Sequence, residues 1–303
     1  MMKFVEIVKK TNIDFIGLRN KAFILSLVFV VLGCIGFVMV SLGKANLSVD
    51  FTGGTQLQVK FSEKISIGDL RGTLTESGLH DVQIQEISGT NEFLIKTKMS
   101  DAEKERAQDT IGKYIAANLK EKKFEIVGSN MVGSTVGRAL KKDAIIALVI
   151  ALVCIIIYIA WRFTFIFGIA ATIATFHDVL TMLGIFYIFN MEMNILFITA
   201  LMTIAGYSLT DTVVVFDRIR ENMAKMKAKS DLASVINFSI NEVLSRTLIT
   251  SLTTAVTIGA ILFLGGEVLF DFAFALFIGV LVGTYSSVFI ASPLVFIWRR
   301  QLR

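Results

Sequence analysis

The sequence is poor in proline, cysteine and histidine, and each shortage excludes a class of protein. A single proline among 303 residues, with a hydrophobic fraction of 54%, excludes collagen-like, linker-rich and disordered chains. The two cysteines, Cys34 and Cys154, both lie in apolar blocks and predict no disulfide framework. Two distant histidines cannot build a histidine-rich metal site, so we expect neither a metal nor a cofactor.

Charge is scarce as well, and the apolar residues come in long blocks. Charged residues make up 18% of the chain, against about 25% in soluble domains. Blocks of about 20 apolar residues match the hydrocarbon core of a bilayer, which is roughly 30 Å thick. Six blocks predict a polytopic α-helical membrane protein, with spans over residues 22–42, 144–160, 165–189, 194–216, 247–264 and 268–297. The first block is too long for a secretory signal, which favours an uncleaved anchor.

The distribution of Lys and Arg predicts the orientation in the membrane. Both termini and the segment 217–245 are rich in Lys and Arg, whereas the turns 190–193 and 265–267 have none. Since positive residues mark the cytoplasmic side, we expect both termini to be cytoplasmic and the long insert to lie outside. The chain then divides into a cytoplasmic N-terminus (1–21), the first span (22–43), an external domain (44–142), spans two to four (143–216), a cytoplasmic segment (217–245), spans five and six (246–298) and a cytoplasmic C-terminus (299–303).

The external insert has the pattern of a small α+β module. Period-two alternation and turn residues predict strands over 56–61, 82–87, 92–97 and 123–127. Ser66 with Asp69 and Ser100 with Glu103 are capping-box pairs that open two helices. The order β-α-β-β-α-β predicts a ferredoxin-like module, a fold that hosts many functions. We expect His80 to be an ordinary surface histidine.

Four ionisable side chains stand out at or inside the predicted spans, apart from Asp271, which we expect at the membrane edge of the last span. They are His177 and Asp178 in the third, Asp211 in the fourth and Arg246 at the start of the fifth. Such groups are costly in lipid, so each is a hypothesis about function. A carboxylate that is buried yet close to an arginine can bind and release a proton near neutral pH, which predicts a relay at Asp211.

Structural roles are the alternative for these residues. Asp211 and Arg246 could instead form a static ion pair that fixes helix register. His177 and Asp178 could equally be a helix-packing contact. The last span is polar over 283–287, which predicts tilt or tight packing.

Motifs for catalysis are missing from the sequence. It has no G-x-x-x-x-G-K-[ST] phosphate loop and no H-E-x-x-H motif, and no nucleophile motif pairs with His177. We therefore do not expect an enzyme. No basic and aromatic surface points to nucleic acid, and we expect the segment 217–245 to lie on the membrane surface or against a partner.

Several strings carry a resemblance to a known family. The longest are Gly206–Asn222, Ser245–Thr254 and Asp50–Gly54, and shorter ones are Ile13–Phe15, His177–Asp178 and Gly283–Ser287. With them the chain resembles the SecF family, membrane subunits of the bacterial SecDF protein-export complex in the resistance–nodulation–division (RND) superfamily. A SecD subunit would have a much larger external domain and a fused SecDF would be much longer, so the resemblance favours a separate SecF chain.

The resemblance implies a function, partners and site residues. It implies that the chain acts with SecD, the SecYEG channel and YajC in the bacterial cytoplasmic (inner) membrane, among its lipids. There a proton or sodium gradient helps to draw exported unfolded polypeptide across the membrane. Asp211 would be the ion-binding carboxylate, Arg246 its partner and Asp178 an accessory. The supporting polar groups would be His177, Ser208, Thr210, Thr212, Thr247 and Thr250.

A motif at the start of the external domain would serve as a hinge. Its residues are Asp50, Phe51, Gly53 and Gly54, and the glycines permit unusual backbone dihedrals.

Two other functions fit part of this pattern. The chain could be half of an RND-type exporter of small molecules or lipids, although one small external module leaves little room for a substrate groove. It could also be a scaffold that steadies the translocon without transporting an ion.

Overall fold

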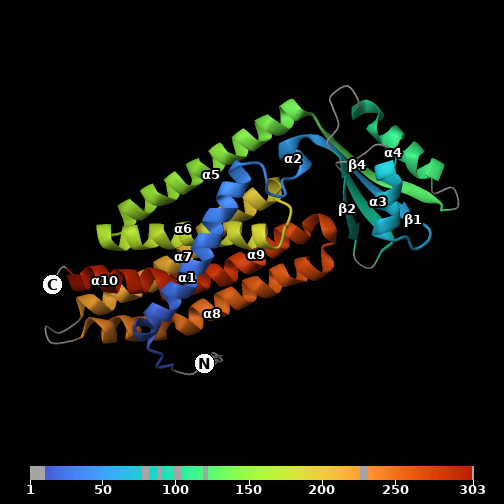
Figure 1. The fold of residues 1–303 in the computed structure, drawn as a ribbon. Helices are drawn as coiled ribbons and strands as arrows, with labels where there is room; N and C mark the ends of the chain where they lie inside the picture. Colours follow the sequence, from blue (N-terminus) through green and yellow to red (C-terminus); the bar gives the residue numbers. More distant parts are fainter. Residues whose placement is uncertain are drawn as a thin grey trace, which may run out of the picture. The chain divides into compact units, whose positions relative to one another are not determined.

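The computed structural model describes residues 11–76, 82–87, 90–97, 104–118, 122–225 and 231–301. The chain forms two compact units, a helical unit of residues 1–46 and 147–303 and an α/β unit of residues 47–146 (Figure 1). The expected histidine His80 and the capping pair Ser100 and Glu103 lie outside the described residues.

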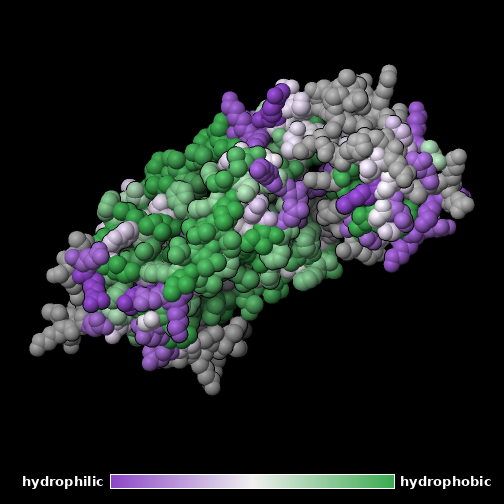
Figure 2. All heavy atoms as spheres, viewed as in Figure 1, coloured by the Kyte–Doolittle hydropathy of each residue, from purple (hydrophilic) through white to green (hydrophobic). Residues whose placement is uncertain are grey.

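Six long apolar helices form the membrane part. They are α1 (Phe15–Ser41), α5 (Ser134–Arg162), α6 (Phe165–Ile188), α7 (Ile195–Ala224), α8 (Leu232–Leu264), and a last span made of α9 (Glu267–Ser286), a π-helical turn η1 (Ser287–Ala291) and α10 (Ser292–Gln301). Within the described ranges, six helices are long and apolar enough to cross a membrane, which confirms the six predicted spans. Hydrophobic residues cover most of the visible surface of this unit (Figure 2).

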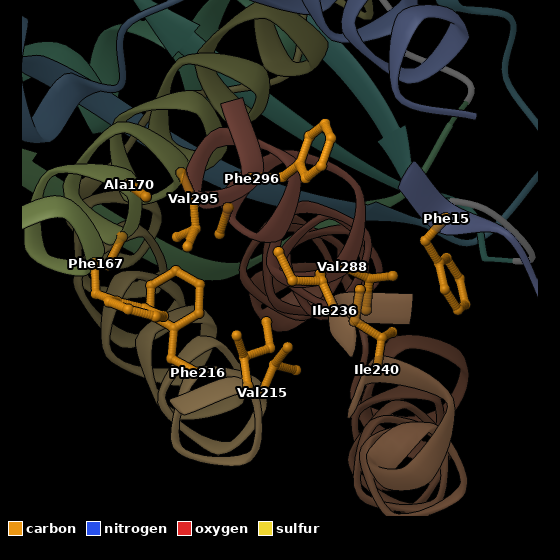
Figure 3. Close-up of a cluster of buried hydrophobic side chains, with 14 of the residues drawn as sticks. Phe15, Phe167, Ala170, Val215, Phe216, Ile236, Ile240, Val288, Val295 and Phe296 are labelled. Carbon is orange, nitrogen blue, oxygen red and sulfur yellow. The ribbon is translucent and has the colours of Figure 1, made fainter. Parts of the chain in front are cut away.

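The helices extend beyond the apolar blocks from which they were predicted. Within the segment 217–245, α7 continues to Ala224 and α8 begins at Leu232. Phe216, Ile236 and Ile240 are buried in one cluster between α7 and α8 (Figure 3), and Ile219 of α7 belongs to the same cluster. Because these apolar residues recur at helical spacing, the two helices continue beyond the apolar blocks and pack against each other.

An aromatic and aliphatic cluster joins the helices near the start of α1 and along α10. It includes Phe15, Phe167, Ala170, Val215, Phe216, Ile236, Ile240, Val288, Val295 and Phe296 (Figure 3). The rings of Phe167 and Phe216 meet edge to face, with centroids 5.0 Å apart. This arrangement is favourable for aromatic pairs and fixes α6 against α7.

The helices α1 and α6 cross at glycines. A Cβ on Gly184 would lie 2.7 Å from the backbone nitrogen of Gly33, and a Cβ on Gly33 would lie 2.1 Å from the carbonyl oxygen of Leu180. Only glycine permits this approach, which is a common way for helices to pack in a membrane.

The last span is interrupted by one wide turn. Ser292 Oγ donates to the carbonyl of Ser287, five residues earlier, at 2.9 Å. Ser286, Ser287 and Ser292 are fully buried, so the polar middle of this span is tightly packed, as the sequence predicted. Single π-helical turns inside α-helices are frequently found at functional sites.

The α/β unit has the predicted element order. Its elements are α2 (Val49–Thr52), β1 (Gly54–Phe61), α3 (Ile67–Glu76), β2 (Val82–Ile87), β3 (Glu92–Thr97), α4 (Lys104–Asn118) and β4 (Phe124–Val132). The strands pair antiparallel in the order β2-β3-β1-β4, with one register shift beside Gln58. Because β3 separates β1 from β2, the topology is compatible with the expected ferredoxin-like module. Alternate residues of β1, Leu57, Val59 and Phe61, are buried in its core.

Candidate ion-coupling site

Three consecutive residues of α9 each bind a different neighbour. Thr284 contacts α7 and α8, Tyr285 contacts α1, and Ser286 contacts α6 and α7. Successive residues of a helix point about 100° apart, so a polar triplet can reach three sides. These residues make α9 the centre of the polar contacts of the bundle.

Asp211 is buried where α7, α8 and α9 meet. Only 5% of its surface is exposed. Thr284 Oγ1 lies 3.3 Å from Asp211 Oδ2 and 2.6 Å from Ser251 Oγ. The hydroxyl of Tyr207, one turn before Asp211, lies 3.3 Å from the same Ser251 oxygen. The carboxylate therefore accepts from a hydroxyl of α9, and a hydroxyl of α8 contacts that one.

The hydroxyls next to Asp211 in sequence have other partners. Thr212 is buried and donates to the carbonyl of Ser208 at 2.9 Å. Thr210 is exposed and donates to the carbonyl of Gly206 at 3.0 Å. Both expected supporting groups thus bond their own helix, and the partners of Asp211 come from α8 and α9.

Asp178 forms a second buried cluster. It is fully buried on α6, and its Oδ1 lies 2.8 Å from Nδ1 of His177. Its Oδ2 accepts from the hydroxyl of Ser208 on α7 and from that of Ser286 on α9, the latter at 2.7 Å. His177 Nε2 is also buried and has no hydrogen-bond partner among the described residues. The structure thus brings His177, Ser208 and Ser286 to Asp178, although Ser208 was expected among the hydroxyls around Asp211.

Arg246 does not pair with Asp211 in this conformation. In the part of the chain that the structure describes, no ion pair joins the two residues, and Arg246 is exposed. Ser251 stands at the level of Asp211 on α8, and Arg246 precedes it by five residues, about 7.5 Å along the helix. The coupling role of Arg246 stays a prediction, and the static pair is not observed here.

Arg246 lines a charged hollow between α7 and α8. The hollow has a volume of about 560 Å³ and is lined by Val214, Asp217, Arg218, Glu221, Glu242, Val243 and Arg246. Arg218 pairs with Glu242 and, at 2.6 Å, with Glu221. Asp217 pairs with Arg162 of α5 at 2.8 Å. The acids around Arg246 therefore already have basic partners.

The other two threonines predicted on α8 differ from each other. Thr247 is 2% exposed, and its hydroxyl has no hydrogen-bond partner within the described ranges. Thr250 is exposed and donates to the carbonyl of Arg246 at 3.0 Å. Only Thr247 faces the interior of the bundle.

The glycine motif of the α/β unit is a packed junction. Gly53 and Gly54 have φ of +72° and +144°, which confirms that the backbone there needs glycine. A Cβ on Gly53 would lie 2.7 Å from Cα of Ser134, at the start of α5. Asp50 and the buried Phe51 belong to the short helix α2 just before it. The hinge role of these residues stays a prediction, since they are tightly packed.

Sequence reasoning missed Ser251, Thr284, Tyr285 and Ser286 as site residues. The available signal was a run of hydroxyls inside an otherwise apolar last span. Which hydroxyl meets which carboxylate depends on how the helices are rotated about their axes, and hydropathy does not encode that. Over the residues that the structure describes, no group of three or more His, Cys, Asp or Glu could hold a metal ion.

Two protein-family models match the chain. Residues 112–301 match the family described as protein export membrane protein SecD/SecF, C-terminal, and residues 44–65 match the SecD/SecF GG motif. The first match covers more than half of the chain, which defines the class as SecD/SecF export membrane proteins.

Relatives that match over nearly their whole length show which family within this class the chain belongs to. The protein translocase subunit SecF of Thermodesulfovibrio yellowstonii is 50% identical over 96% of both chains. That of Calditerrivibrio nitroreducens is 41% identical over 98% of both. The chain therefore belongs to the SecF family of protein translocase subunits.

A solved structure has the same fold. The crystal structure of SecDF from Thermus thermophilus, described as a translocon-associated membrane protein, matches 99% of this chain with a TM-score of 0.84 and 36% identity. The chain spans only 40% of the length of that SecDF protein. A second structure of SecDF, in a super-membrane-facing form, matches with a TM-score of 0.69.

Proposed function

We propose that this subunit couples the flow of a cation, H⁺ or Na⁺, to the late stages of polypeptide export, together with SecD. The observation that carries the proposal is Asp211, a carboxylate buried within an apolar span that accepts from a hydroxyl of α9, which in turn contacts a hydroxyl of α8. A buried carboxylate with polar surroundings on three helices can take up a cation and change how those helices pack.

A face of α7 and α8 supports SecD as the partner. Threonines at helical spacing are exposed on each helix, namely Thr199, Thr203 and Thr210 on α7 and Thr250, Thr253 and Thr257 on α8. Small hydroxyl residues are typical of contacts between membrane helices. Relatives named SecDF carry a counterpart of this chain within a longer protein. We infer that helices of SecD cover these two threonine rows.

Cation uptake at Asp211 would act through α9. Neutralising this carboxylate weakens its attraction for hydrogen-bond donors and for the cation of Arg246, so α7, α8 and α9 repack. Tyr285, next to Thr284, holds α1 at the carbonyl of Ala22 (2.9 Å), and α1 leads directly into the external module. One charge crossing 100 mV supplies about 2.3 kcal/mol, so a few charges can bias a motion that costs a few kcal/mol.

The same proposal includes the orientation and the wider assembly. Both termini lie in the cytoplasm and the α/β unit lies outside, in line with the Lys and Arg distribution. SecYEG, YajC and the exported polypeptide are the further partners. The chain acts as a coupling subunit and not as an enzyme.

Asp211→Asn tests the proposal. In vesicles that contain the whole translocase, we expect the variant to lose gradient-dependent export under imposed H⁺ and Na⁺ gradients. Export without a gradient and assembly with SecD should persist. Normal gradient-dependent export by the variant would refute the coupling role.

A pull-down in mild detergent separates this function from the alternatives. Recovery of SecD-like and SecY-like partners favours a translocase subunit over an RND-type exporter. If Asp211→Asn loses those partners instead of gradient dependence, the chain is a scaffold.

A further inference from the structure

A row of hydroxyls leads to Asp211 from one side. The hydroxyl of Tyr207 lies 3.3 Å from Ser251 Oγ, which lies 2.6 Å from Thr284 Oγ1, which lies 3.3 Å from Asp211 Oδ2. The row crosses from α7 to α8 to α9 and back to α7. Ser251 and Asp211 are 6% and 5% exposed, so the last part of the row is shielded from lipid.

The single proton of a hydroxyl in the row can be donated to either of two acceptors. A hydroxyl carries one donor and two lone pairs, so it can accept a proton on one side and release its own on the other. Ser251 Oγ also lies 2.9 Å from the carbonyl of Thr247, and Thr284 Oγ1 lies 2.8 Å from the carbonyl of Val280. A carbonyl oxygen can only accept. The hydroxyls of Ser251 and Thr284 can therefore each donate to their own helix or turn toward the next member of the row.

The row has a definite direction along the bundle. Tyr207 precedes Asp211 by four residues on α7, which is about 6 Å farther from the connection between α7 and α8. In the proposed orientation that connection is cytoplasmic, so Tyr207 stands on the external side of Asp211. The charged hollow beside Arg246 stands on the opposite side of the carboxylate.

We propose that Tyr207, Ser251 and Thr284 deliver protons from the external side to Asp211, and that the cation coupled here is H⁺. The inference rests on the proposed function, for which it names the ion and the uptake residues. Thr284 gives its proton to the Asp211 carboxylate, Ser251 gives its proton to Thr284, and Tyr207 gives its proton to Ser251. A hydronium ion on the external side then protonates Tyr207 and becomes water. One O–H bond forms and one breaks at each step.

A hydroxyl row favours protons over metal ions. It can pass a proton by exchanging bonds while every oxygen stays in place. A hard metal cation must instead be surrounded by about six or more oxygen ligands at each stopping point. The chemistry of the row therefore selects H⁺.

Removing the hydroxyls tests the row in the complete translocase in vesicles. We expect Ser251→Ala and Thr284→Val to slow export driven by an H⁺ gradient on the order of 100-fold, the loss typical of a missing proton-transfer group. Ser251→Thr and Thr284→Ser keep a hydroxyl and should retain most of the rate. Thr172→Val is the matched control, because Thr172 is half-buried on α6 and donates only to the carbonyl of Gly168.

Tyr207→Phe removes one oxygen at the rim of the row and serves where the inner variants fail to assemble. We expect it to slow H⁺-driven export as well. Unchanged H⁺-driven export in Tyr207→Phe, or in assembled Ser251→Ala and Thr284→Val, overturns the proposal. A Na⁺ gradient that drives export without an H⁺ gradient also overturns it. If Asp211→Asn blocks export while the hydroxyl variants do not, the proposed function stands and only the row fails.

Discussion

Asn241 on α8 holds the backbone of Ile13 with both polar atoms of its side chain. Its Oδ1 accepts from the Ile13 N–H at 3.0 Å, and its Nδ2 donates to the Ile13 carbonyl at 2.9 Å. One turn earlier, Asn237 accepts from the Ile16 N–H at 3.0 Å and donates to Asp14 at 2.6 Å. The first N–H groups of a helix have no partner within it, so these two asparagines complete the start of α1 and tie it to α8.

We expect Asn241→Ala to destabilise the protein by about 1 kcal/mol, because it removes hydrogen bonds that lie partly in water. The measurement is thermal or denaturant unfolding in a mild detergent. Phe238→Ala is the control, since Phe238 lies between the two asparagines in sequence and is 63% exposed. A larger loss in the control than in Asn241→Ala would contradict this role.

Asp14 should make the stability of the folded protein depend on pH. The backbone N–H of Gly17, and to a smaller extent Asn237, lower the pKa of the Asp14 carboxyl from its ordinary value of 3.8. A carboxyl with a lowered pKa in the folded state stabilises the fold above its unfolded pKa and loses that contribution as the pH falls through the folded value. In thermal unfolding, the difference between the natural protein and Asp14→Asn should shrink as the pH falls below 3.8. A difference that does not vary with pH would contradict the assignment.

Gly53→Ala should damage the protein far more than Gly43→Ala. Gly53 has φ +72° and ψ 157°, a backbone conformation that essentially only glycine adopts, and Gly43 has φ +69°; such conformations cost a residue with a Cβ about 1–3 kcal/mol. Nothing lies within 4 Å of a Cβ on Gly43, whereas a Cβ on Gly53 would meet Cα of Ser134 at 2.7 Å. The added loss in Gly53→Ala measures this crowding together with the greater backbone strain, and limited proteolysis or unfolding can report it. Equal losses would mean that the junction has room to relax.

Asp178 variants can separate a packing contact from a relay. Asp178→Ala leaves His177, Ser208 and Ser286 without their buried acceptor, at a cost of about 3–5 kcal/mol. Asp178→Asn keeps the shape and one acceptor oxygen, so we expect a smaller loss. If Asp178→Asn lowers gradient-driven export only in proportion to stability, Asp178 is a packing contact. Lost export at unchanged stability would identify it as part of the relay.

The sequence predicted the features that have a simple period or length. A bilayer fixes the length of an apolar block, so all six spans were found. Alternation along a sheet fixes the strands, and those over Val82–Ile87 and Glu92–Thr97 lie where they were expected. The ends of the helices were predicted less accurately than their presence. For example, α8 begins at Leu232, well before the apolar block that starts at residue 247.

The partners of Asp211 could not be predicted in the same way. Arg246 was expected beside it because of its charge and its place at the start of a span. The structure instead brings Ser251 and Thr284 to the carboxylate. Whether position 246 or 251 of α8 stands at the depth of Asp211 depends on how far two helices slide along each other. Packing across the whole bundle decides that, and no local pattern records it.

The backbone contact between Gly53 and Ser134 has a consequence for how this protein could have evolved. Both residues lie within the α/β unit, one before and one after the segment that carries the sheet, so the residues between them form a loop whose ends are in contact. The entropic cost of closing such a loop increases only slowly with the number of residues in it. A module of another size could therefore be spliced in at this point during evolution while the membrane helices kept their sequence.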